Sequence, residues 1–145
     1  MKHKGNKCDF TKERNSELLQ AYRKLIAEKS FIESDKVFKE VINMPASRFW
    51  VSEERAAIVL SLMMNGDKLK NMLPSKREMF FEIFRRAKEL RKKNPQYTFK
   101  ELAQMIVVQP APKFYLTSDS AMVIITCEKK RWYEERRKKL RHLFG

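Results

Sequence analysis

Two stretches of the sequence match each other closely, PASRFWVSEERAAIVL at residues 45–60 and PAPKFYLTSDSAMVII at residues 110–125. Over these 16 ungapped positions four residues are identical and eight more are chemically alike. Each stretch opens with a proline, which forces the residue before it into extended geometry. Each then passes from aromatic and β-branched residues into apolar residues at helical spacing. We therefore expect a short extended segment followed by a helix in both places.

The match continues upstream in the same order. FKEV at 38–41 corresponds to FKEL at 99–102, and ELLQAYRK at 17–24 resembles EMFFEIFRR at 78–86. Chance explains one such pair more easily than three pairs in register. We interpret the sequence as an internal duplication.

The first copy predicts three helices. Apolar residues recur at helical spacing near residues 12–30. A second helix is expected to begin near Ser34, a favourable N-cap residue. A third helix is expected to begin at Ser52 and to stop at the Asn-Gly pair of residues 65–66.

The second copy carries sharper signals. Ser75 and Glu78 have capping-box spacing, and so do Thr98 and Glu101. The last helix is expected to start at residue 117 or 118 and to reach Leu143, with an apolar, buried first half and a basic, projecting second half.

These elements predict a mainly α fold of two tandem three-helix, helix-turn-helix-like repeats. Short extended linkers and a long C-terminal basic helix complete it. The expected domains are a basic flexible tail (1–11), repeat one (12–66), a linker (67–74) and repeat two (75–145). The two proline-initiated segments either serve as extended linkers or pair as a brief two-stranded ribbon.

Composition narrows the class of protein. The chain has 145 residues, of which 43% are hydrophobic, so it can bury a core. No apolar run is long enough for a membrane span, and the N-terminus lacks the apolar stretch of a secretory signal. Two cysteines make no disulfide scaffold, so we expect a cytoplasmic protein, nucleoid-associated if it binds DNA.

Residues suited to catalysis are scarce. The two histidines, His3 and His142, lie at opposite ends of the chain, and Cys127 is fifteen residues from His142 on one predicted helix, too far to share a metal ion. With three glycines and no phosphate-loop or nucleophile motif, we expect a non-enzymatic protein with no metal and no cofactor.

The net charge of +14 is concentrated in three segments. Residues 1–8 carry three lysines and no acid, whereas residues 76–93 and 128–145 each carry eight basic and three acidic residues. Residues 17–64 are neutral overall, and residues 78–144 carry +8. Such concentration is typical of a surface that binds phosphates. The alternative is a solvated basic face without a specific partner.

We therefore predict a nucleic-acid-binding protein, with DNA favoured over RNA, that acts through repeat two as an accessory or regulatory factor. On the last helix Lys129, Arg136 and Lys139 share a face with Trp132, and Lys130, Arg137 and Arg141 form a neighbouring stripe. Local pairing of Glu134 and Glu135 with nearby lysines is the alternative for this helix. The full set of candidate contacts is Arg85, Arg86, Arg91, Lys92, Lys93, Lys129, Lys130, Arg131, Trp132, Arg136, Arg137, Lys138, Lys139 and Arg141.

Two other functions remain open. The first is an RNA-binding or ribonucleoprotein subunit, because phosphates look alike in both nucleic acids. The second is an assembly module, because MFFEIF at 79–84 spreads apolar groups around more than half of a helix and leaves a face at Phe80 and Phe81 for a protein partner or a second copy. Membrane binding is not expected.

The segment PA-x-[RK]-F-[WY], followed by a capped helix, resembles uncharacterised small basic proteins of bacterial phages and mobile elements. The resemblance covers most of the chain and implies no activity.

Overall fold

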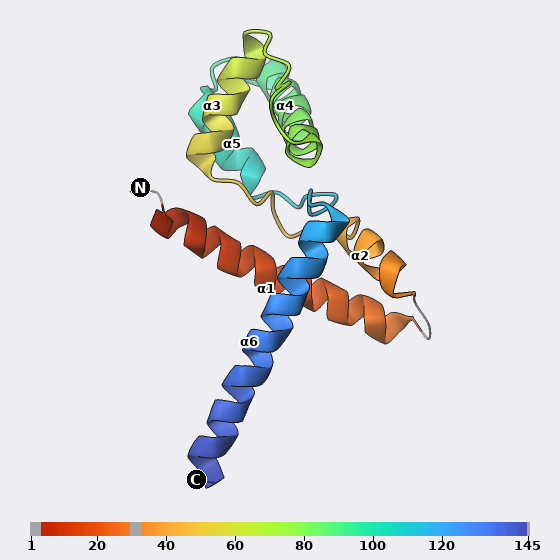
Figure 1. Ribbon diagram of the computed structural model, residues 1–145. Coiled ribbons are helices and arrows are strands. Elements are labelled where there is room, and N and C mark those ends of the chain that lie inside the picture. The colour runs from red at the N-terminus through yellow and green to blue at the C-terminus, as the bar shows by residue number, and fades with distance from the viewer. Residues whose placement is uncertain (1–3, 30–32, 145) are drawn as a thin grey trace. The chain divides into compact units, whose positions relative to one another are not determined.

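The computed structural model describes residues 4–29 and 33–144, and in this part of the chain it contains six helices and no strand (Figure 1). The side chains of residues 4–9, 34 and 35 are not described. The helices are α1 (Lys4–Glu28), α2 (Ser34–Ile42), α3 (Glu53–Met64), α4 (Pro74–Lys93), α5 (Phe99–Val107) and α6 (Ser118–Phe144). The predicted mainly helical class is confirmed.

The helices form two compact units. Unit 1 contains α1, α2 and α6, each of which contacts the other two. Its core includes Leu18, Val41, Ala121 and Ile125, none more than 1% exposed. Unit 2 spans Asn43–Leu116 and contains α3, α4 and α5, which likewise contact one another.

The core of unit 2 is larger and includes an aromatic residue from the linker between α2 and α3. Phe49 is fully buried, together with Leu60, Ile83 and Ile106. Its backbone N–H donates to the carbonyl of Val107 at 3.0 Å, which holds the linker against the end of α5. The ring also stacks on Tyr115, with 6.1 Å between centroids.

The compact units do not coincide with the predicted sequence repeats. Helix α3, from the first predicted repeat, packs on α4 and α5, and α6, from the second, packs on α1 and α2. Helix α1 also begins at Lys4, so it takes in residues 4–11, which were predicted to be a flexible tail. Of the predicted tail lysines, Lys2 lies outside the described residues, as does His3.

The local helix signals have a mixed outcome. The side chain of Ser52 caps α3 by accepting from the N–H of Arg55, and the Thr98–Glu101 capping box is present at α5. The predicted Ser75–Glu78 capping box is wrong. Helix α4 begins at Pro74, with Leu73 as N-cap and no side-chain hydrogen bond. Proline favours the first helical position because its fixed φ suits the helix and it has no N–H to leave unpaired.

The two proline-initiated segments meet inside unit 2. Ala46 and Ala111, which occupy matched positions in the two sequence stretches, form an isolated antiparallel bridge. Each donates its N–H to the carbonyl of the other at 3.0 Å. Of the two alternatives, the structure thus has pairing between the segments, reduced to one bridge.

Candidate nucleic-acid interface

The basic second half of α6 is the first part of the predicted interface. Ala121 and Ile125 in its first half are buried. All residues from Arg136 to Phe144 are exposed. Figure 1 shows α6 crossing α1 and continuing beyond it. The second half is exposed as predicted, whereas the first half is buried on one side only, since Met122 and Val123 are 45% and 58% exposed.

One predicted face of α6 packs on α1. The Lys129 ammonium lies 5.0 Å from the centroid of the Tyr22 ring, and the Arg23 guanidinium of α1 lies 4.7 Å from that of Trp132. Arg136 lies over the same indole at 5.1 Å. Cations over aromatic faces are attracted by the ring quadrupole. The contacts of Lys129 with Tyr22 and of Arg23 with Trp132 therefore help to join α1 to α6, and the Trp132 indole already has two cationic neighbours.

The neighbouring stripe is free of such contacts. We call Lys130, Arg137 and Arg141 the outer stripe. All three are exposed, and within the described part of the chain their side chains have no ion pair, hydrogen bond or aromatic contact. The same holds for Lys138, also exposed, so pairing with Glu134 or Glu135 is not seen. Arg131 differs because it is bonded to Glu128 at 2.8 Å.

Lys139 lies on the other side of the helix, at the exposed end of the face that Trp132 begins. With Lys138, His142 and Leu143 it lines a shallow open hollow. Leu143 and Phe144 are 74% and 85% exposed. Positive charge and apolar surface therefore lie together at this end of α6.

The second predicted cluster lies on α4 in unit 2, and two of its arginines already form ion pairs and hydrogen bonds within the protein. Arg85 binds Glu82 at 2.7 Å and Glu89 at 2.9 Å. Arg86 donates to Glu82 at 2.8 Å, to the Gln109 side chain at 3.0 Å and to the carbonyl of Pro110 at 3.1 Å. Its guanidinium lies 4.8 Å from the Phe49 centroid.

The charge of this network is largely balanced. Hydrogen bonds from Arg85, assisted by those from Arg86, hold the pKa of Glu82 below its ordinary value. The pKa of Tyr115, whose ring stacks on Phe49, is raised to about 12, mainly by burial and further by the charges of Glu82 and Glu78. Arg85 and Arg86 thus serve the internal structure of unit 2.

The remaining predicted residues of α4 lie at its last turn. Arg91 lies over the Phe99 ring, 4.8 Å from the centroid. Lys92 and Lys93 are exposed, and all three lie in the last turn, where positive charge complements the helix dipole. The structure divides the predicted site between two units, with Arg85 to Lys93 in unit 2 and Lys129 to Arg141 in unit 1.

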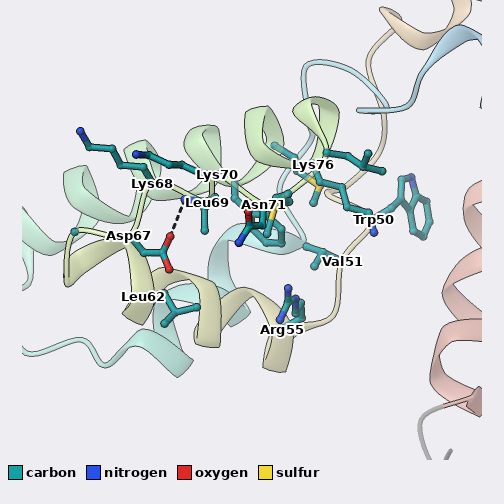
Figure 2. A pocket seen from close by; sticks show the side chains of 15 residues that line it. Trp50, Val51, Arg55, Leu62, Asp67, Lys68, Leu69, Lys70, Asn71 and Lys76 are labelled. Atoms are coloured by element: carbon teal, nitrogen blue, oxygen red, sulfur yellow. Dashed lines mark hydrogen bonds between the residues drawn. The ribbon is translucent and has the colours of Figure 1, made fainter.

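Unit 2 also has a hollow that sequence reasoning missed. It lies between α3 and the start of α4 and has a volume of about 870 Å³ (Figure 2). Arg55, Lys68, Lys70 and Lys76 line it, with Asp67 as the one acidic residue in the lining. These cations come from three separate segments, so only their convergence in space makes them noticeable.

The predicted assembly face is reduced by the fold. Phe80 is 3% exposed and belongs to the core of unit 2, whereas Phe81 is 46% exposed. Helix periodicity indicated the surplus apolar residue correctly at Phe81 and wrongly at Phe80.

Among the described residues no group of three or more His, Cys, Asp or Glu side chains is placed to hold a metal ion. Helices long and apolar enough to cross a membrane are not found in the described ranges either. Comparison of the chain with protein-family models, curated proteins and solved structures found no match.

Proposed function

We propose that this chain is a non-enzymatic nucleic-acid-binding protein that acts on duplex DNA as an accessory or regulatory factor. The observation that carries the proposal is the outer stripe of α6. Its three cations are exposed and have no acidic partner in the described part of the chain. Neutralising phosphates with such residues releases counterions and drives binding without sequence preference.

The dimensions of the stripe suit a duplex. Lys130 and Arg141 are eleven residues apart on one helix, which corresponds to about 16 Å at a rise of 1.5 Å per residue. Phosphates of one DNA strand follow at about 3.4 Å along the helix axis. The outer stripe therefore covers an axial length that corresponds to about five phosphates of one strand, and Lys138 lies beside it.

A salt titration tests this function. Binding to a fluorescent duplex is measured by anisotropy from low to moderate salt for the wild type and for the triple variant Lys130→Gln, Arg137→Gln, Arg141→Gln. The plot of log K against log salt has a negative slope, and each lost phosphate contact makes it shallower by about 0.9. The slope of the triple variant should therefore be shallower than that of the wild type by about 2.7.

The matched control removes three exposed charges outside the candidate contacts, in the variant Lys12→Gln, Lys24→Gln, Lys100→Gln. It has the same net charge as the outer-stripe variant, and its slope should stay close to that of the wild type. Equal flattening in both variants, or no binding of the wild type at low salt, would contradict the proposal.

The RNA alternative is decided in the same assay. Unlabelled duplex DNA and structured RNA compete for the labelled site. DNA should displace the label at the lower concentration, and the reverse order would assign the protein to RNA. The assembly alternative rests on Phe81, and sedimentation of Phe81→Ser against the wild type tests it. A defined oligomer that this change disrupts, without affinity for nucleic acid, would favour assembly.

We also infer that the chain arose by duplication and that the two copies exchanged their third helices. In this view α1–α3 and α4–α6 are the copies. Two observations support this interpretation. Ala46 and Ala111, at matched positions, bond to each other through their backbones. Each unit also combines the first two helices of one copy with the third helix of the other.

Hydrogen exchange distinguishes exchanged from tandem repeats. Ile125→Ala in α6 should lower amide protection in α1 and α2, and Leu60→Ala in α3 should lower it in α4 and α5. If Ile125→Ala instead lowered amide protection in α4 and α5 and left α1 and α2 unchanged, the repeats would be tandem.

A further inference from the structure

The hollow of unit 2 has no role in the function proposed above. It is bounded by α3, by the loop of residues 65–73 and by the start of α4 (Figure 2). Its volume of about 870 Å³ lies within the range of cavities that hold small molecules and cofactors. Leu62, Met72 and Phe80 are among the apolar residues that line it.

The loop has a fixed local geometry. Gly66 ends α3 with φ +97°, and the Asp67 carboxylate accepts the N–H of Leu69 at 2.7 Å. Leu69 itself has φ +56°, which is uncommon for a residue with a side chain, and is 6% exposed. Burial of Leu69 therefore anchors the loop, with the exposed Lys68 and Lys70 on either side of it in sequence.

Positive charge dominates the lining. Arg55 comes from α3, Lys68 and Lys70 from the loop, and Lys76 from the first turn of α4. All four are exposed, and no ion pair, side-chain hydrogen bond or aromatic contact of theirs occurs in the described ranges. A concave surface lined by one sign of charge concentrates ligands of the opposite sign.

The lining also offers groups that suit a heteroaromatic base. Trp50 contributes a half-buried indole with the Arg48 guanidinium 5.5 Å from its centroid, and a base can stack on an aromatic ring irrespective of its hydrogen-bonding pattern. The amide of Asn71 can both donate and accept hydrogen bonds. Figure 2 shows Asn71 between the lysines of the loop, on one side, and Trp50 with Lys76, on the other.

We propose that this hollow binds a nucleoside polyphosphate. The base lies against Trp50 and Asn71, and the phosphate chain lies at Lys68 and Lys70. Arg55 and Lys76 add positive charge along the hollow. This site is independent of the outer stripe of α6, so it can be present whether or not the protein binds DNA.

Isothermal titration calorimetry of the full chain with ATP, inorganic triphosphate and adenosine separates the contributions. ATP should bind saturably, triphosphate should bind about tenfold more weakly because it lacks the base, and adenosine should not bind measurably. Asn71→Ala should weaken ATP binding several-fold and leave triphosphate unchanged. Asn71 is exposed, so its replacement should be tolerated by the fold.

The charged end is tested by Lys68→Gln, Lys70→Gln against the control Lys92→Gln, Lys93→Gln, which removes the same charge from the end of α4. The loop variant should lose about tenfold in ATP affinity and the control should keep that of the wild type. Equal losses, equal binding of ATP and triphosphate, or no saturable ATP binding at millimolar concentration would overturn the proposal. Because DNA is absent from these titrations, their failure leaves the salt-titration result on DNA unaffected.

Discussion

Replacing Arg86 with methionine should destabilise unit 2, although sequence alone suggests a surface cation. The side chain is 22% exposed and bonds to Glu82, Gln109 and the Pro110 carbonyl, with its guanidinium over Phe49. It therefore joins α4 to the segment that follows α5. Methionine keeps an unbranched apolar stem and removes every one of these contacts.

The size of the effect follows from these contacts. Hydrogen bonds that involve a charged group contribute about 1.5–3 kcal/mol each, and a cation over a buried ring such as Phe49 contributes about 1–2 kcal/mol. The sum overstates the loss, because Glu82 keeps Arg85 and the bond to Pro110 is exposed, so water can replace it. We expect the free energy of unfolding to fall by about 2–3 kcal/mol.

Arg85→Met is the matched control. Arg85 is the neighbouring residue on the same helix and also bonds to Glu82, but its side chain is 56% exposed and contacts only residues of α4 in the ion pairs described. Exposed pairs of this kind contribute little to stability. Urea unfolding followed by circular dichroism, with hydrogen exchange to locate the change in α4 and α5, measures both variants. Equal midpoints for the two variants would refute the structural role of Arg86.

Acid provides a second test of the same network. The pKa of Glu82 is lower in the folded protein than its ordinary value. A carboxylate of this kind stabilises the fold fully above its unfolded-state pKa, and the contribution is lost as the pH falls through the folded-state pKa. The difference in stability between wild type and Arg86→Met should therefore narrow in acid, and a difference that stays constant would contradict the assignment.

Three further predictions test local features of the structure. Thr98→Ala should lower stability by about 1 kcal/mol in urea unfolding because it removes a capping box, and Ser75→Ala should change stability little because Ser75 caps nothing. Gly66→Ala should cost about 1 kcal/mol, since φ is +97° and no neighbour lies within 4 Å of the added carbon, whereas Gly66→Asn should cost less; equal costs would argue against strain as the cause. Burial raises the pKa of Tyr115 in the folded protein to about 12, so the neutral phenol favours the folded state. Its contribution to the free energy of unfolding is complete below the unfolded-state pKa and is lost as the pH rises toward 12. Tyr115→Phe should therefore lose less stability than the wild type over this alkaline range, and identical pH profiles would contradict the assignment.

Sequence-local signals predicted most helix ends, but they missed the start of α1 at Lys4 and failed at α4, where two signals competed. Pro74 and Ser75 both mark a helix start, and the proline prevailed because its fixed φ suits the first helical position. In the candidate interface, helical periodicity separated two basic faces of α6. It could not show that α1 supplies Tyr22 and Arg23 to one of them, because that contact joins residues more than a hundred positions apart.

The partners of the third helices could not be predicted for a more basic reason. Ala56 of α3 and Ala121 of α6 occupy matched positions and are both fully buried, and Leu60 and Ile125, also matched, are each 1% exposed. The two helices thus present the same small-then-large pattern to whatever they pack against. Nothing in that pattern distinguishes α1 and α2 from α4 and α5 as partners. The choice depends on where the linkers lead each helix, and the backbone bonds between Ala46 and Ala111 form in that linker region without using any side chain.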